Sequence, residues 1–183
     1  MPYKSTWSGE FAFLGRRIRN AVGELGSEIH HIGSTSVPGL PAKDVVDIQL
    51  TVSDLYAPIQ APLEQAGFKR STKLLVDHCP PGLTLNQNEL AKQVYGFEGR
   101  RVHLHVRKAG QFNQRYALLC RDFLRSHPLA AAAYGEIKQQ LARYFPDDVE
   151  AYYDVKDPVF DVLMAGAEEW ALRVEWKSPP SDA

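Results

Sequence analysis

The sequence predicts an α+β fold, in which a small β-sheet carries helices on one face and a helical cap packs beside it. Two stretches, residues 45–52 and 102–106, alternate apolar and polar side chains as β-strands do. After Gly110 the hydrophobic spacing becomes helical and stays so. The 183 residues, 44% of them hydrophobic, suit one domain over residues 1–176, with an α/β part (about 1–110) and a helical part (111–176).

The first predicted element is an amphipathic helix over residues 7–28, which Gly26 is placed to end. Its apolar side chains fall at helical spacing: Phe11, Leu14, Ile18, Val22 and Leu25. Residues 29–32 are short and apolar, and we expect a strand there. The segment GSTSVPGLPAK (33–43) is rich in glycine, serine and proline and predicts a loop.

Residues 45–52 (VVDIQLTV) are dense in β-branched side chains and predict a strand. Alternation places three polar side chains on one of its faces: Asp47, Gln49 and Thr51. A helix over 55–66 and a strand over 68–76 should follow, and then a polar loop over 77–91.

Two further strands, 94–97 and 102–106, flank a turn at Gly99, and the second carries His103 and His105 on one face. The remainder predicts helices, the last beginning at the pair Asp157-Pro158. Their expected ranges are 112–125, 128–145, 147–154 and 158–174. The tail over 177–183 (KSPPSDA) is expected to be disordered.

Composition narrows the possible partners. The formal net charge of −1 argues against sequence-independent binding of duplex DNA, which needs a basic surface. No apolar run approaches the roughly 20 residues of a membrane helix, and the first residues lack a signal-peptide core. Cys79 and Cys120 form neither a C-x-x-C motif nor a disulfide framework. We therefore expect a cytoplasmic protein without a membrane partner.

The segment IGSTSVPGLPAKDVVDIQL (32–50) carries the sharpest candidate site. A serine hydroxyl and successive backbone N–H groups in a turn such as Gly33 to Ser36 form a concave site suited to phosphate. A strand carboxylate such as Asp47, facing this turn, can hold Mg²⁺, whose shell phosphate oxygens and water complete. This combination is typical of phosphoryl or nucleotidyl transfer. The alternative is a polar turn and a carboxylate that only forms an ion pair.

Several strings of the chain together resemble the GrpB family, a group of bacterial proteins in the nucleotidyltransferase superfamily. HHIGSTSVPGLPAKDVVDIQL is followed, in order, by VHLHV, RYALLCRDFLRSHP and ARYFPDDVEAYYDVK, and the similarity covers roughly residues 9–170. The resemblance implies a nucleotidyltransferase-like mixed sheet with flanking helices and a C-terminal helical cap. GrpB-like domains also occur fused to dephospho-CoA kinases.

The chain departs from the superfamily pattern at its metal site. Superfamily enzymes carry two carboxylates one residue apart on the strand after the glycine-serine turn, whereas here Asp47 is followed by Gln49. A third carboxylate has no clear match. An amide adds no charge, so metal affinity should fall, and Gln49→Glu or Gln49→Asp is expected to restore a second metal-binding carboxylate.

The histidines leave several roles open. His103 and His105 could each be a metal ligand, a phosphate contact or a general base near neutral pH. They could instead be buried and hydrogen-bonded to Asp47 or to backbone, and the three residues together would also make a plausible zinc site. His31, just before the turn, could orient the loop or serve structure alone.

Basic and aromatic side chains could complete the site. Lys43 closes the loop and could reach a phosphate or stay solvated, and Lys156 matches a family lysine. Arg107 shares the histidines' strand face. Arg121 could clamp a phosphate or form an ion pair, and Tyr152 could stack on a base or pack in the core.

These observations favour an enzyme that binds an NTP with Mg²⁺ and moves a nucleotidyl group onto a small-molecule acceptor. Asp47 and His105 would hold the metal, and His103 or His105 would complete its shell or take the acceptor's proton. The expected phosphate contacts are Gly33, Ser34, Thr35, Ser36, Lys43, Arg107 and Lys156. The turn, Asp47 and both histidines should then line one cleft. Two alternatives are a nucleotide- or CoA-binding accessory module without turnover, and a metal-dependent hydrolase that uses the histidines.

Overall fold

A computed structural model describes residues 1–73 and 75–183. Its centre is a mixed five-stranded sheet with the strand order β1-β2-β5-β4-β3. β2 and β5 run parallel, whereas the other neighbours pair antiparallel. The strands are β1 (Gly26–Ile32), β2 (Val46–Val52), β3 (Phe68–Arg70), β4 (Gln93–Phe97) and β5 (Arg100–Lys108). The predicted fold class, a mixed sheet with flanking helices and a C-terminal helical cap, is confirmed.

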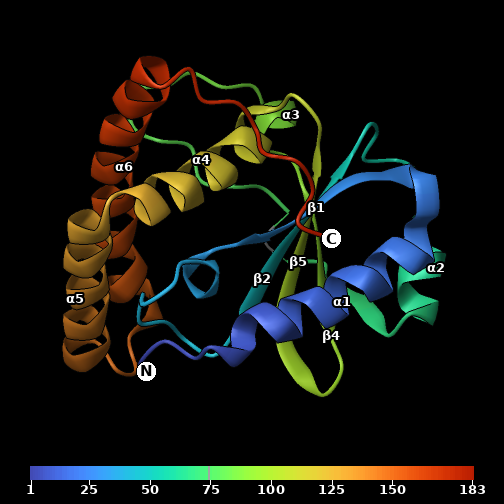
Figure 1. Cartoon of the computed structure of the whole chain (residues 1–183), viewed down its shortest axis with the longest axis horizontal. Helices are drawn as coiled ribbons and strands as arrows, with labels where there is room; N and C mark the ends of the chain where they lie inside the picture. Colours follow the sequence, from blue (N-terminus) through green and yellow to red (C-terminus); the bar gives the residue numbers. More distant parts are fainter. Residues whose placement is uncertain (74) are drawn as a thin grey trace.

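Helices cover the sheet on both sides (Figure 1). Two belong to the N-terminal half, α1 (Thr6–Val22) and α2 (Gln60–Gln65), and a short α3 (Gln87–Leu90) precedes β4. The helical cap consists of α4 (Phe112–Ser126), α5 (Pro128–Tyr144) and α6 (Val149–Arg173). Short 3₁₀ turns follow α1 (Gly23–Leu25) and β1 (Ser34–Ser36).

The alternation of β2 and β5 decides which helices cover which face. Their apolar side chains, among them Ile48, Leu50 and Leu104, pack with α1 and α2 in one buried cluster that also contains Trp7. Their polar side chains point the other way, toward α4 and the cap. A second apolar cluster joins α4, α5 and α6 to the loop at Val37. The polar face of the sheet therefore lies between the sheet and the cap, which is where a site can form.

The C-terminal part differs from the prediction at Pro158. The expected break between helices 147–154 and 158–174 is wrong, because α6 runs without interruption through Pro158. A proline inside a helix removes one backbone hydrogen bond and costs roughly 3 kcal/mol. Packing offsets this cost, since α6 buries Met164, Ala167 and Ala171 against the second apolar cluster.

The tail 177–183, expected to be disordered, instead lies along β1 (Figure 1). The backbone N–H of Asp182 donates to the carbonyl of Ile29 at 2.9 Å, and the Asp182 carboxylate accepts from Nη1 of Arg121 at 2.7 Å. Nε2 of His30 lies 3.2 Å from the carbonyl oxygens of Pro179 and Pro180. Composition alone cannot predict these long-range hydrogen bonds. They hold in place a segment whose polar composition predicts disorder.

Several predicted boundaries also shift. α1 ends at Val22 rather than near residue 28, because Gly23 takes a positive φ of 54° and β1 begins at Gly26. The helix predicted over 55–66 is shorter, spanning Gln60–Gln65. The strand predicted over 68–76 pairs only as far as Arg70, and Val76 forms an isolated bridge with Ala91. Residue 74 of that range lies outside the described residues.

Across the described ranges 1–73 and 75–183, every helix falls short of the length or the apolar character that membrane crossing needs.

Candidate functional site

The turn after β1 packs directly on the carboxylate of Asp47. Gly33 has φ 68° and ψ −172°, a region that side chains other than glycine's rarely occupy. A Cβ at this position would overlap Oδ2 of Asp47 and lie 3.0 Å from its Cγ. β1 and β2 pair so that Ile32 lies opposite Asp47, which brings the turn to the carboxylate. The glycine is therefore needed both for its backbone and for the close approach.

The three hydroxyls of the turn have different partners. Oγ1 of Thr35 is buried 3.0 Å from Nε2 of His31, and Oγ of Ser36 donates to the Gly33 carbonyl at 2.6 Å. These two side chains hold the turn together. The Ser34 hydroxyl lies at the cleft, where Nζ of Lys138 donates to it at 2.7 Å. His31 thus orients the loop, which was one of its two predicted roles.

Lys138 is the main cleft residue that sequence reasoning missed. It comes from α5, is almost fully buried, and also donates to the carbonyl of Pro41 at 2.9 Å. Burial, with a smaller contribution from the Lys156 charge, lowers the pKa of Lys138 to about 8. The ammonium group is still charged at neutral pH and lies against the Ser34 hydroxyl. A lysine in a helix of mixed composition gives no signal in the sequence that separates it from a surface lysine.

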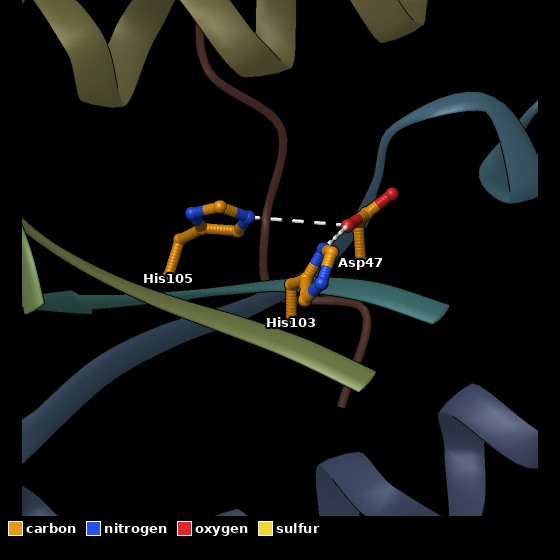
Figure 2. Close-up of side chains that lie close together, drawn as sticks. All are labelled: Asp47, His103 and His105. Carbon is orange, nitrogen blue, oxygen red and sulfur yellow. Dashed lines mark hydrogen bonds and ion pairs between the residues drawn. The ribbon is translucent and has the colours of Figure 1, made fainter. Parts of the chain in front are cut away.

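Asp47, His103 and His105 gather on the polar face of β2 and β5 (Figure 2). Nδ1 of His103 lies 3.1 Å and Nε2 of His105 lies 3.9 Å from the same oxygen, Oδ1 of Asp47. Burial opposes ionisation of Asp47, but the hydrogen bond from His103 and the nearby His105 ring lower the pKa of its carboxyl to about 2. Burial lowers the pKa of His105 to about 4, so its ring is neutral at pH 7.

Gln49 does not join this cluster, although it lies on the same strand face as Asp47. Its side chain is fully buried beneath α4. Its Nε2 donates to the carbonyl of Gln114 at 3.1 Å, and its Oε1 accepts from Nη1 of Arg107 at 2.6 Å. Both ends of the amide are hydrogen-bonded within the fold, which argues against the expectation that a carboxylate at this position would reach the metal.

Arg107 is likewise held away from the cleft as a structural ion pair. Its guanidinium binds the Asp77 carboxylate through Nε at 2.8 Å and Nη2 at 3.0 Å. Lys92 pairs with the same carboxylate, and both cations are nearly buried. Burial would raise the pKa of Asp77, but the charges and hydrogen bonds of Arg107 and Lys92 lower it below its usual range. The structure thus gives no support to Arg107 as a phosphate contact.

The turn, the cluster and the helical cap enclose one cleft of about 850 Å³. Gly33, Ser34, Asp47, His103 and His105 all line it, as the sequence predicted. The basic side chains in its lining are Lys43, Lys92, Arg121, Lys138, Arg143 and Lys156, and the acidic ones are Asp47, Asp77 and Asp157. Positive charge prevails, which favours an anionic ligand.

Other predicted contacts have partners within the chain. Nζ of Lys156 donates to Asp157 at 2.7 Å, and Nζ of Lys43 lies 4.4 Å above the ring centre of Tyr152. The Tyr152 ring is largely buried and also lines the cleft.

Arg121 forms ion pairs with Asp122 and Asp182, at 2.8 and 2.7 Å. Its guanidinium also donates to the carbonyl of His31 at 3.1 Å, beneath the turn. The ion-pair alternative for Arg121 therefore describes its position better than the phosphate clamp.

The mixed five-stranded sheet, the glycine-serine turn on a strand carboxylate and the C-terminal helical cap define an α+β protein. A comparison with protein families finds that the family model for the GrpB protein matches residues 1–165. The chain therefore belongs to the GrpB family.

Relatives in sequence carry two kinds of name. A UPF0157 protein of Pseudomonas aeruginosa is 38% identical over 176 residues, covering 91% of this chain and 66% of the relative. A protein of Mycolicibacterium paratuberculosis named dephospho-CoA kinase is 31% identical over 193 residues, covering 97% of this chain but 47% of the kinase. The chain thus spans about half the length of the dephospho-CoA kinases that it matches.

Among solved structures, the crystal structure of the conserved protein GrpB from Enterococcus faecalis has a TM-score of 0.73 and 25% sequence identity. The alignment covers 97% of this chain and 99% of that one.

Proposed function

We propose that this protein is a nucleotidyltransferase that binds an NTP in the cleft and transfers its nucleotidyl group to a small-molecule acceptor. In this reaction an acceptor oxygen or nitrogen forms a bond to the α-phosphorus. The bond from that phosphorus to its bridging oxygen breaks, and pyrophosphate leaves. The chain would bind the phosphates, align the acceptor with the α-phosphorus and neutralise the negative charge of the phosphates.

One observation carries the proposal: Nζ of Lys138 donates to Oγ of Ser34 within the turn that packs on Asp47. A lysine ammonium has no lone pair and can only donate. The Ser34 hydroxyl therefore accepts from Lys138, which leaves its own hydrogen free to point to a phosphate oxygen in the cleft. One ammonium charge and one oriented hydroxyl thus converge at the same place.

Further cationic side chains surround this position. Lys43, from the loop before β2, and Lys156, from α6, both line the cleft. Both are held near aromatic rings, with Nζ of Lys156 5.2 Å above the ring centre of Tyr153. Two or more lysines around a phosphate chain neutralise charge without demanding one geometry. We propose that they bind the phosphates together with the backbone of residues 33–36.

The donor set does not match the magnesium ion that the superfamily pattern implies. Magnesium takes oxygen ligands in octahedral geometry, whereas this cluster offers one carboxylate and two imidazoles. The amide of Gln49, which stands where a second carboxylate would be, is committed to Arg107 and Gln114. We derive no catalytic step through magnesium.

Nucleotide binding and turnover can be measured separately. Saturating NTP should raise the melting temperature, since ligand at about 100 times its Kd stabilises a protein by roughly 2.7 kcal/mol. Ser34→Ala and Lys138→Met should weaken NTP binding at least about tenfold, because each removes a phosphate contact. Lys108→Met, at an exposed position outside the cleft, is the matched control. Pyrophosphate release with hydroxyl and amine acceptors then reports transfer. Unchanged melting with all four NTPs would overturn the proposal.

A second candidate is a nucleotide- or CoA-binding accessory module without turnover. It is favoured by the structural use of Gln49 and by the relatives named dephospho-CoA kinase, of which this chain matches about half. This module should bind NTP, CoA or dephospho-CoA, with the same loss in Lys138→Met. It would release no pyrophosphate with any acceptor. Pyrophosphate release that depends on Ser34 and Lys138 would exclude it.

A further inference from the structure

His105 presents a largely buried imidazole whose hydrogen bonds are incomplete. Its Nδ1 is buried without a partner among the residues that the structure describes. Its Nε2 lies 3.9 Å from Oδ1 of Asp47, which is too long for a normal hydrogen bond. Buried polar groups are almost always satisfied. A group located between Nε2 of His105 and Oδ1 of Asp47 would give Nε2 the close partner that this separation denies it, although it would not reach Nδ1.

The strand register brings a third ligand atom, from His103, to the same place. Asp47 and His103 are direct partners in the parallel pairing of β2 and β5, and His105 follows two residues along β5 on the same face. One ligand atom from each residue lies within 4.8 Å of the other two. The three side chains converge above the sheet in Figure 2. A site built on two adjacent strands has a rigid base.

The separations suit one bound ion. Nitrogen and oxygen ligands about 2.1 Å from a metal, at tetrahedral or octahedral angles, lie roughly 3.0–3.4 Å apart. The observed separations from Oδ1 of Asp47 are 3.1 Å to His103 and 3.9 Å to His105. His103 is already within this range of Asp47, and His105 would need to move closer when an ion binds.

We infer that Asp47, His103 and His105 form a binding site for a first-row divalent transition ion, such as zinc or cobalt, rather than for magnesium. Imidazole suits these ions, whereas magnesium and calcium prefer oxygen ligands. Three protein ligands leave at least one coordination position open, as in catalytic rather than structural zinc sites. That position faces the cleft, because the His103 side chain is 52% exposed and the Asp47 side chain 26%.

The inference deepens the proposed function and rests on it for its role, because the ion would lie beside the turn that binds the phosphates. An ion there would polarise a phosphate oxygen or a water molecule. Metal binding itself needs no nucleotide, so it can be measured alone. Loss of nucleotide binding with metal binding intact would reject only the proposed function. Nucleotide binding without transition-metal binding would reject only this inference.

The test uses the full chain stripped of metal with a chelator. We expect about one Co²⁺ per chain with visible ligand-field absorption, displacement of Co²⁺ by Zn²⁺, and no displacement by about a hundredfold excess of Mg²⁺. His103→Gln and His105→Gln should each weaken Co²⁺ binding at least about tenfold. Equilibrium dialysis with elemental analysis gives the stoichiometry independently of the spectrum.

His78→Gln is the matched control, because His78 lines the same cleft but pairs with Asp161 outside the cluster. It should leave Co²⁺ binding unchanged. His103 is half exposed, so His103→Gln should fold even if the buried His105 proves essential for folding. Absence of Co²⁺ binding, equal binding in wild type and His103→Gln, or ready displacement by Mg²⁺ would overturn the inference.

Discussion

Oε1 of Gln49 accepts a hydrogen bond from Nη1 of Arg107 at 2.6 Å, in a fully buried contact between two neighbouring parallel strands. The same amide donates to the backbone of α4. Gln49 therefore fastens the sheet to the helical cap. Together with Asp77, it also accepts the hydrogen bonds that the buried guanidinium of Arg107 donates.

Gln49→Glu should consequently lower stability without creating a metal ligand. A carboxylate at this position would keep the Arg107 contact but turn an oxygen toward the carbonyl of Gln114, where the amide now donates. We expect a loss of about 1–3 kcal/mol in the free energy of unfolding at neutral pH, measured by urea denaturation. Metal affinity should stay within about twofold of wild type, since the side chain lies outside the cluster. The exposed Gln139→Glu is the control and should change stability by less than about 0.5 kcal/mol.

The contrast between Asp47 and Gln49 shows which features of the site the sequence can predict and which it cannot. Strict alternation in 45–52 and 102–106 predicted both strands, and it correctly placed Asp47, His103 and His105 on one face. Alternation cannot say which part of that face lies under α4 and which opens to the cleft. That depends on where the helical cap docks, and so Arg107 was predicted as a phosphate contact, whereas the structure pairs it with Asp77 and Gln49.

Long-range contacts explain the other differences. Lys138 reaches Ser34 from a helix more than a hundred residues away, and no local pattern marks it. Local rules for proline and for polar tails predicted a break at Pro158 and disorder over 177–183. Packing of α6 and hydrogen bonds to β1 override both.

The pH dependence of stability should reveal the buried ammonium group of Lys138. Its pKa is lowered from 10.5 to about 8, so between these values the unfolded chain binds more protons than the folded chain. Stability then rises with pH in this window through this group. Relative to Lys138→Met, wild type should gain up to about 3 kcal/mol in the free energy of unfolding between pH 8 and pH 10.5. The measurement is urea denaturation of both proteins at several pH values. A difference that stays constant across the window would contradict the burial of this charge.

The tail should contribute to stability through Asp182. Its Oδ2 accepts from the buried Arg121 at 2.7 Å and from the backbone N–H of His31 at 2.9 Å. Asp182→Ala leaves both donors short of a partner and should cost about 1–3 kcal/mol of unfolding free energy. Asp147→Ala, at an exposed position, is the control. If the two variants lost equally little unfolding free energy, residues 179–183 would not be bound to β1 in solution.

Gly33→Ala should weaken ligand binding at the candidate site more than it lowers the stability of the protein. Two costs apply, because alanine is strained at φ 68° and its Cβ would overlap the Asp47 carboxylate. Strain of this kind costs about 1–3 kcal/mol. Relief of the overlap must move either the turn or Asp47, which separates Ser34 from the metal-binding cluster. We therefore expect Co²⁺ and NTP binding to weaken at least about tenfold in a protein that still folds.

The control for this substitution is Gly39→Ala in the same loop. Gly39 has a comparable φ of 79°, but a Cβ added there would meet no atom within 4 Å in the described structure. It therefore carries the backbone strain without the overlap. Urea denaturation and Co²⁺ titration of both variants separate the two effects: Gly39→Ala should lose stability and keep its Co²⁺ affinity, whereas Gly33→Ala should lose both. If Gly33→Ala bound Co²⁺ as well as Gly39→Ala does, the close approach of the turn to Asp47 would have no part in shaping the site.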